Sequence, residues 1–207
     1  MSHSEYKNLE DIWNAGCQNN AFDYCYGLDA FIKEKSKEYI YKAGVYWPEF
    51  DFDKALDALI EIRDPDFIFR AGRSWKTFDA EKGLNSLINL KSARFIYYAG
   101  LEWRQFDFQA GTEALLMLGN IEFVFYAGAH WKRFDLTAGA ALIINDGNPE
   151  YIYKAGDQWA VFDYDGGWLA MEAFIKKGAR WRGRAFENKK WRKALKALWE
   201  KACSKES

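Results

Sequence analysis

The sequence predicts an all-α protein, an α-solenoid of seven two-helix units with a 28-residue period whose last unit is an atypical basic cap. Three observations lead to this prediction. The dipeptide Ala-Gly recurs every 28 residues, and apolar residues surround it at helical spacing. The 207 residues also include only 3 prolines, which favours helices over a turn-rich β protein.

The repeat is easiest to follow through its glycines. They are Gly16, Gly44, Gly72, Gly100, Gly128 and Gly156. An aliphatic residue stands four positions before each glycine, an aromatic residue stands three before, and a tryptophan follows three after in every unit but the first. A Phe-Asp dipeptide comes next, from Phe22-Asp23 in the first unit to Phe162-Asp163 in the sixth. Six copies in register indicate a tandem repeat.

The first helix of each unit is predicted to begin after a capping residue eight positions before the glycine. These residues are Asn8, Ser36, Asp64, Ser92, Asn120 and Asn148. Their side chains can accept hydrogen bonds from the free N–H groups of a first turn. In the second unit, Ile40, Ala43, Gly44 and Trp47 follow at the spacing of one helix face.

The glycine inside this predicted helix needs a reason, because it costs about 0.5–1 kcal/mol relative to alanine. We favour close approach, in which Ala-Gly opens a groove for a neighbouring helix or an aromatic ring. The alternative is that glycine ends the first helix as a C-cap, with tryptophan in the turn. The tryptophans themselves are expected in an inter-repeat core, each burying about 150–250 Å², rather than in a base-stacking ladder.

The second helix of each unit is predicted to follow the Phe-Asp dipeptide, with the aspartate as its N-cap. In the second unit this helix carries Phe52, Ala55, Leu56, Leu59 and Ile60 at helical spacing. Twelve residues separate the aspartate from the next capping residue. This distance leaves room for about nine or ten helical residues and a short loop.

The end of the array departs from the pattern. Residues 174–181 resemble the first-helix motif, but Gly178 follows Gly156 by only 22 residues. Ala170 occupies the capping position, so we expect the second helix of the sixth unit to continue into the seventh. Terminal repeats are often atypical because they cap an exposed face. The predicted organisation is a disordered tail over residues 1–7, six repeats over 8–175, and a basic capping unit and tail over 176–207.

The motif Tyr-Ile-Tyr-Lys-Ala-Gly-x-x-Trp-x-x-Phe-Asp, found at residues 151–163, resembles short two-helix units in tandem-repeat proteins of bacteria and their phages. It is more distantly similar to the HEAT and tetratricopeptide classes, whose unit length differs, so no binding residues transfer from them. The resemblance covers residues 8–202 and implies a scaffold without a particular activity. By analogy, a phage or bacterial origin would suit an inhibitor or adaptor that binds a larger complex.

The sequence lacks the motifs of common catalytic sites. It has no P-loop, nucleophile elbow or dinucleotide-binding glycine pattern, and its two histidines, His3 and His130, stand apart from any metal-ligand spacing. Its three cysteines are interpreted as reduced thiols. We therefore expect no enzymatic activity, cofactor or metal. No apolar run of about 18 residues predicts a membrane span, and with no secretory signal a cytoplasmic location is expected.

Charge is unevenly distributed along the chain. Residues 1–175 contain 17 Lys and Arg and 27 Asp and Glu, whereas residues 176–207 contain 12 and 3, for net charges of −10 and +9. The basic end is interpreted as a footprint for nucleic acid or an acidic partner, or as the solvated face of an amphipathic capping helix. That helix would bury Trp191, Leu195, Leu198, Trp199 and Ala202. Head-to-tail self-association through the oppositely charged ends is a third possibility.

Surface columns that vary between units are candidates for partner binding, because packing does not dictate them. The candidate residues are Lys42, Arg70, Arg73, Lys76, Tyr98, Arg104, Tyr126, His130, Lys132, Arg133, Arg180, Arg182 and Arg184. We expect a non-catalytic scaffold that binds another protein. The alternative is a nucleic-acid-binding solenoid that uses the basic edge of repeats three to five and the basic cap. A solenoid that follows a nucleic-acid backbone would need a cation in the same surface position of every unit. The position of Lys42, Arg70 and Lys154 is occupied by Tyr98 and Tyr126 in two units, which favours a protein partner.

Overall fold

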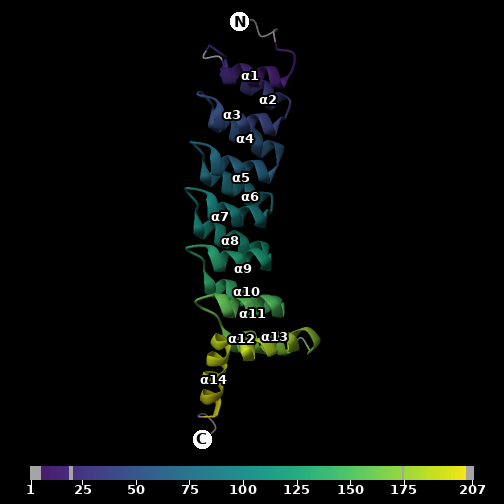
Figure 1. The fold of residues 1–207 in the computed structure, drawn as a ribbon, viewed down its shortest axis with the longest axis vertical. Coiled ribbons are helices and arrows are strands. Elements are labelled where there is room, and N and C mark those ends of the chain that lie inside the picture. Colours follow the sequence, from purple (N-terminus) through teal and green to yellow (C-terminus); the bar gives the residue numbers. More distant parts are fainter. Residues whose placement is uncertain (1–5, 19–20, 174, 204–207) are drawn as a thin grey trace. The chain divides into compact units, whose positions relative to one another are not determined.

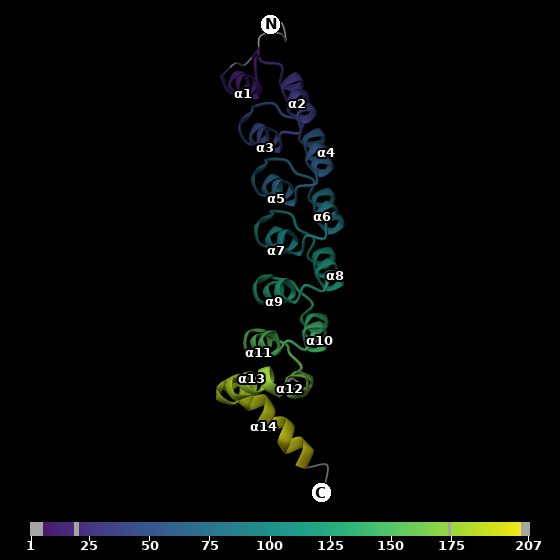
Figure 2. The same ribbon diagram turned by 90° about the vertical axis from the view of Figure 1, so that its right-hand side faces the viewer.

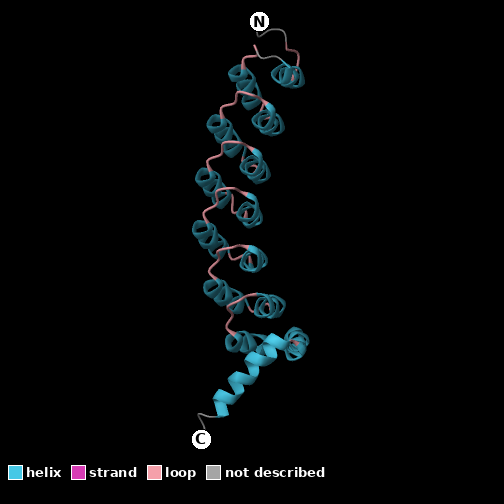
Figure 3. Cartoon of the chain, turned by 60° about the vertical axis from the view of Figure 1, so that its left-hand side comes forward, coloured by secondary structure: helices cyan, strands magenta, loops and turns pink. Residues whose placement is uncertain are grey.

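The computed structural model describes residues 6–18, 21–173 and 175–203. Within these residues the chain forms 14 helices and no strand, as Figure 3 shows. The all-α prediction is confirmed. The predicted tail falls mainly on residues 1–5, which lie outside the described part.

The chain divides into two compact units, Met1–Asp107 and Phe108–Ser207. The helices of the first unit, labelled in Figure 1, are α1 (Leu9–Gln18), α2 (Tyr24–Lys33), α3 (Lys37–Tyr46), α4 (Phe52–Ile62), α5 (Pro65–Ser74), α6 (Ala80–Asn89) and α7 (Ala93–Glu102).

Helices of the first unit are arranged in two layers, which Figure 2 shows side by side. The first-helix layer contains α1, α3, α5 and α7, and the second-helix layer contains α2, α4 and α6. Each helix packs on its neighbours in sequence and on the next helix of its own layer. The core lies between the layers, where Ile40, Leu59 and Ile68 are fully buried.

The second unit contains α8 (Phe108–Leu118), α9 (Ile121–His130), α10 (Leu136–Asp146), α11 (Pro149–Gln158), α12 (Tyr164–Ala173), α13 (Ile175–Glu187) and α14 (Lys189–Cys203). Its layers follow the same rule: α9 packs on α11 and α11 on α13, while α8 packs on α10 and α10 on α12. The predicted continuation of α12 into α13 falls on residue 174, which lies outside the described residues.

Aspartate side chains start the second helices, as predicted. Asp51 accepts a hydrogen bond from the backbone N–H of Lys54 at 3.0 Å, and Asp79 accepts one from that of Lys82 at 2.9 Å. Asp135 makes the same kind of contact at the start of α10. These bonds satisfy N–H groups that the first turn of a helix leaves free.

Two predicted caps of first helices are wrong. Ser36 and Ser92 precede α3 and α7, but neither side chain makes a capping hydrogen bond. Their backbone N–H groups instead donate to Phe31 and Leu87, five residues earlier, after a lysine with positive φ. The serines therefore complete the C-terminal motif of the preceding helix through their backbone N–H groups.

The glycines open space for tryptophan, which confirms close approach over the C-cap alternative. Gly44 lies inside α3, and the helix ends two residues later, with Trp47 as the C-cap residue. A Cβ atom added to Gly44 would lie 2.4 Å from Nε1 of Trp75. Only glycine leaves room for an indole ring so close to the helix backbone.

Three tryptophans of the repeat are buried and hydrogen-bonded to the preceding first helix, whereas the buried Trp47 Nε1 makes no hydrogen bond to a described residue. Trp75, Trp103 and Trp159 are at most 7% exposed. Their Nε1–H groups donate to backbone carbonyls 34 residues earlier, those of Tyr41, Phe69 and Phe125. This burial confirms the predicted core role and leaves these rings no face for stacking on bases.

The last tryptophan contact uses Trp191 rather than the tryptophan of the expected motif, Trp181. A Cβ at Gly156 would lie 2.5 Å from Trp191 Cε2, and Trp191 Nε1 donates to the Tyr153 carbonyl at 3.1 Å. Asn188 caps α14 by accepting from Trp191 N at 3.1 Å. Because α13 runs for 13 residues, the capping residue and the tryptophan come later here than in the preceding 28-residue repeats.

Of the amphipathic face predicted for this last helix, Trp191 and Leu195 are buried and Leu198 is half-buried. The other two predicted core residues, Trp199 and Ala202, lie outside the described side chains. We find no helix in the described part of the chain with the length and apolarity that crossing a membrane requires.

Candidate interaction surface

Cations on the outer face of the first-helix layer lie over aromatic rings of their own helix. In the first unit, the Lys42 Nζ atom is 5.5 Å from the centre of the Tyr39 ring. On α5 the Arg70 guanidinium lies 5.2 Å from the Phe67 ring. Both pairs are three residues apart, a spacing that places side chains on one face of a helix. The contacts hold the cations flat against the surface.

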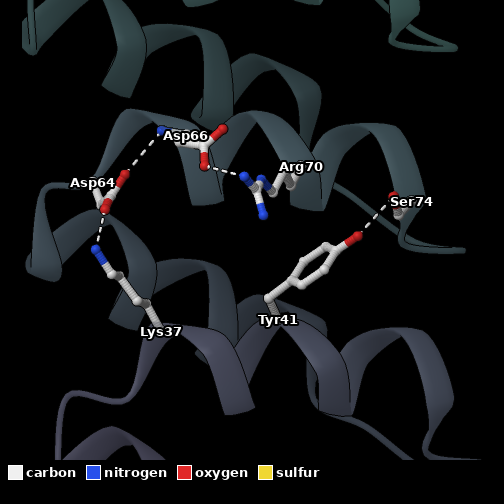
Figure 4. A network of polar contacts seen from close by, with 6 residues as sticks. All are labelled: Lys37, Tyr41, Asp64, Asp66, Arg70 and Ser74. Carbon is white, nitrogen blue, oxygen red and sulfur yellow. Dashed lines mark hydrogen bonds and ion pairs between the residues drawn. The ribbon is translucent and has the colours of Figure 1, made fainter.

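A polar network joins α3 to α5 beside these cations, as Figure 4 shows. Lys37 donates to Asp64, and Asp64 accepts from Asp66 N at 3.0 Å. Asp66 also pairs with Arg70 at 2.7 Å. Burial alone would raise the pKa of Asp64, but the hydrogen bonds from Lys37 and from the Asp66 backbone outweigh it, so that the pKa is lowered.

The same face continues onto α7 with alternating charge. Arg73 lies 5.6 Å from the Phe69 ring and forms an ion pair with Glu102 at 3.4 Å. Tyr98 is half-buried, and its ring centre is 6.1 Å from that of Phe69. Cations, carboxylates and rings are therefore interleaved. We call the exposed residues Lys42, Arg70, Arg73, Lys76 and Arg104, together with Tyr98, the first-helix face.

Two members of this face lie in the turns that follow the first helices. Lys76 and Arg104 line a pocket of about 330 Å³ whose walls include Trp75, Trp103 and Phe78. Both cations are exposed, and the Lys76 ammonium lies 5.7 Å from the Phe52 ring. The pocket therefore has an apolar base and a cationic rim.

The second unit holds the remaining predicted residues. On α9 the rings of Tyr126 and His130 are stacked, with centres 6.0 Å apart and an interplanar angle of 9°. Lys132 and Arg133 are exposed in the turn after α9. On α11 Lys154 repeats the arrangement of the first unit, because it lies over the Tyr151 ring and pairs with Glu150 at 2.6 Å.

Three predicted arginines lie on α13. Arg180 and Arg184 flank Trp181, at 5.5 and 4.7 Å from its ring, and Trp181 contacts the Tyr153 ring at 5.4 Å. Arg182 is half-buried instead and approaches Glu172 at 3.7 Å. Two arginines on one aromatic ring form an exposed cationic patch on the first-helix side of the second unit.

The structure therefore brings together Arg70, Arg73 and Lys76 along one helix and its turn, and separately groups Arg180 with Arg184. Sequence reasoning missed the aromatic residues beneath the cations, such as Tyr39 and Phe67. The signal was present in the sequence as an aromatic residue three or four positions before Lys42, Arg70, Arg73, Lys154 and Arg184.

No set of three or more His, Cys, Asp and Glu side chains among the described residues has the arrangement of a metal site. Cys17 and Cys25 are free and exposed. Burial raises the pKa of the Cys17 thiol, although a contact with the Trp47 indole partly offsets this rise. A raised pKa leaves less of the reactive thiolate at neutral pH.

Comparison with known proteins adds no relative. The sequence matches no protein-family model, and neither the curated proteins nor the solved structures contain a significant match. Functional conclusions about this chain therefore rest on its own sequence and geometry.

Proposed function

We propose that the chain is a non-catalytic α-solenoid of seven two-helix units with a 28-residue period, and that it serves as a protein-interaction scaffold. By this proposal it acts as an inhibitor or adaptor that binds a larger complex. The consecutive helix packing within each unit supports the solenoid. A second observation supports it: the indoles of Trp75, Trp103 and Trp159 each donate to a backbone carbonyl that lies 34 residues earlier in the sequence.

The observation that carries the binding proposal is the composition of the first-helix face. Arginine and tyrosine are enriched at protein interfaces, and here Arg70, Arg73 and Tyr98 are exposed or half-buried on rings that hold them in place. Preorganised side chains lose less conformational freedom on binding, so more of the contact energy contributes to affinity.

The signs of the charges favour a protein over a phosphate backbone. Arg70 is paired with Asp66 and Arg73 with Glu102, so the face presents both signs. Nucleic acid favours an unbroken positive surface, because every phosphate repels a neighbouring carboxylate. A protein surface of mixed charge can match this pattern residue by residue.

The proposal is tested by affinity capture from a lysate of the source organism with the full chain as bait. The variant Arg70→Glu/Arg73→Glu reverses two charges of the first-helix face. The control Asp57→Glu/Lys82→Arg keeps an ion pair of the second-helix layer and leaves this face intact. We expect the wild type and the control to retain the same protein and the charge-reversed variant to lose it. Equal capture by all three would contradict the proposal.

A nucleic-acid function remains the alternative, because one feature favours it. The last 32 residues carry a net charge of +9, and Arg180, Arg184, Arg192 and Lys193 are exposed there. A titration of the full chain with DNA and RNA at two salt concentrations separates the two functions. Saturable binding that weakens steeply with salt would support the alternative.

Self-association through the charged ends is tested by sedimentation at low and high salt. Head-to-tail contacts between a basic and an acidic surface would produce concentration-dependent species that dissociate as salt is added. A monomer at both salt concentrations would exclude this form of assembly. The full chain is needed here, because removal of the basic end also removes Trp191 from its position against Gly156.

A further inference from the structure

The second-helix layer of the second unit changes charge along its length: α14, which packs on α12, is basic, whereas α8, α10 and α12 are not. Helices α8, α10 and α12 carry four acidic side chains, Glu113, Asp146, Asp165 and Glu172, and no Lys or Arg. The rest of their exposed surface is uncharged. This composition differs from that of the first unit, whose second helices include lysines.

In the first unit the corresponding positions form ion pairs between successive second helices. Lys54 of α4 pairs with Asp29 of α2 at 2.5 Å, and Lys82 of α6 pairs with Asp57 of α4 at 2.6 Å. Hydrogen bonding to the carboxylate raises the pKa of both lysines. Three repeats later in the sequence, the positions of Asp57 and Lys82 are occupied by Ala141 and Gly166.

An apolar groove lies in the second unit where this pair is missing. It has a volume of about 530 Å³ and is lined mainly by α10, including Ala141 and Ile144, and by the turn before α12, including Val161. Large apolar side chains are exposed in the turn before α12 and on α12 itself. Val161 is 54% exposed, and Leu169, which follows Ala141 by one repeat, is 59% exposed.

Met117 extends this apolar surface toward α8. It is 72% exposed and stands one repeat before Asn145, which lines the groove. Exposed apolar residues that cluster on one face, with acidic residues around them, indicate a binding surface rather than ordinary solvent-exposed surface. Packing between second helices does not require these apolar residues, since the first unit makes the same helix contacts with ion pairs at the corresponding positions.

We propose that this groove binds a basic amphipathic helix of a partner protein. An amphipathic helix presents apolar residues at i, i+3, i+4 and i+7, which can enter a groove that runs along helices. Its lysines or arginines would then face the acidic residues at the border, Asp146, Asp163 and Asp165, all of which are exposed. Charge complementarity favours a basic partner, because every charged side chain of α8, α10 and α12 is acidic. The Lys190 ammonium, which reaches the turn before α12 from α14, is held by the Asp157 and Trp159 carbonyls.

The groove uses other residues than the first-helix face and differs from it in charge, because the groove is bordered by acidic residues alone and the first-helix face presents both signs. A scaffold with both surfaces could hold a basic helix of one protein in the groove while its first-helix face engages another. The two surfaces can be tested independently, because each variant below changes only the second-helix layer.

The test uses a fluorescein-labelled peptide of leucine and lysine in which the leucines occupy one helix face. Fluorescence anisotropy measures its binding to the full chain. Two control peptides keep the same length: one scrambles the leucines around the helix, and one replaces every lysine with glutamate. We expect saturable binding of the amphipathic basic peptide and binding at least about tenfold weaker for both controls.

The decisive variant, Ala141→Asp/Gly166→Lys, installs in the groove the ion pair of the first unit. A lysine fits at position 166, because Lys54 and Lys82 occupy the matching position after a capping aspartate. A Cβ at Gly166 would meet the carboxylate of Asp163, the residue that corresponds to the capping aspartates Asp51 and Asp79 of the first unit. We expect affinity to fall by about tenfold or more, with an unchanged helical circular dichroism spectrum.

The matched control is again Asp57→Glu/Lys82→Arg, which leaves the groove untouched and should bind the peptide as the wild type does. Equal affinity of Ala141→Asp/Gly166→Lys and the wild type would overturn the proposal. So would equal binding of the scrambled or acidic peptide. A concentration-dependent dimer that Ala141→Asp/Gly166→Lys abolishes would also overturn it, by assigning the groove to a second copy of this chain.

Discussion

At the scale of the residue, the construction depends on the fit between a glycine and the tryptophan of the following helix pair. The fit is tight at Gly16, Gly44, Gly72, Gly128 and Gly156, and a Cβ on Gly72 or Gly128 would lie 2.4 Å from the ring. The indole N–H also bonds a backbone carbonyl of the same helix, as Trp103 does with Phe69. Sequence columns alone predicted the close approach, but not which atom the indole would bond.

Gly128→Ala tests this fit. Alanine favours a helix by about 1 kcal/mol over glycine, yet its Cβ would clash with Trp159, a ring that is only 1% exposed and cannot move aside. We expect the free energy of unfolding to fall by about 1–3 kcal/mol, measured by urea denaturation.

The matched control is Gly183→Ala in α13 of the same unit, where a Cβ would meet nothing within 4 Å. Here helix propensity acts alone, so stability should stay the same or rise by up to about 1 kcal/mol. Equal effects of the two substitutions would show that the glycine column does not serve tryptophan packing.

At the scale of the element, helix starts differ in whether a side chain caps them. Aspartate caps the second helices at short distance, whereas Ser36 and Ser92 make no cap. Sequence reasoning treated all these residue types alike, because it could not see that the backbone N–H groups of the two serines close the preceding helix while their side chains make no capping bond.

Asp79→Ala and Ser92→Ala form a matched pair within the first unit. Loss of the Asp79 cap should reduce the free energy of unfolding by about 0.5–2 kcal/mol. Ser92→Ala removes no capping bond and should change it by no more than about 0.5 kcal/mol. Thermal or urea unfolding of both variants gives the comparison, and a larger loss for Ser92→Ala would contradict the assigned cap geometry.

The Lys37–Asp64 contact between α3 and α5 makes the stability of the first unit depend on pH. The pKa of Asp64 is lowered in the folded chain, so its stabilising effect is present above the unfolded pKa of about 3.9 and is lost as pH falls through the folded value. Between about pH 5 and pH 2, Asp64→Asn should therefore lose less stability than the wild type. Parallel pH profiles of the two proteins would show that this carboxylate is not stabilised by folding.

At the scale of the whole molecule, sequence reasoning predicted the helical class and the order of the helices. It could do so because the same pattern of packing residues recurs six times in the sequence. It failed where the repeat ends. Trp191, not Trp181, fills the last position, since the longer α13 delays the cap at Asn188. A motif match could not reveal this shift, because which tryptophan reaches Gly156 depends on the length of the intervening helix.

The candidate surfaces show the same limit. The cationic residues of the first-helix face were named from variable columns, but the rings that support Arg70 and Arg73, although they stand three and four positions earlier in the sequence, were recognised only from side-chain geometry. The apolar groove was missed because Ala141 and Gly166 are unremarkable residues. They become informative only by comparison with Asp57 and Lys82, which form an ion pair at the matching positions of the first unit.

Hydrogen exchange of the indole N–H groups, followed by NMR in ¹⁵N-labelled protein, tests most directly whether helix pairs stack through tryptophan. We expect slow exchange for the four indoles that donate to a carbonyl of the preceding first helix, those of Trp75, Trp103, Trp159 and Trp191. Trp168, whose exposed ring nitrogen bonds only a nearby glutamate, should exchange much faster. Exchange of all of these groups at one fast rate would contradict the account.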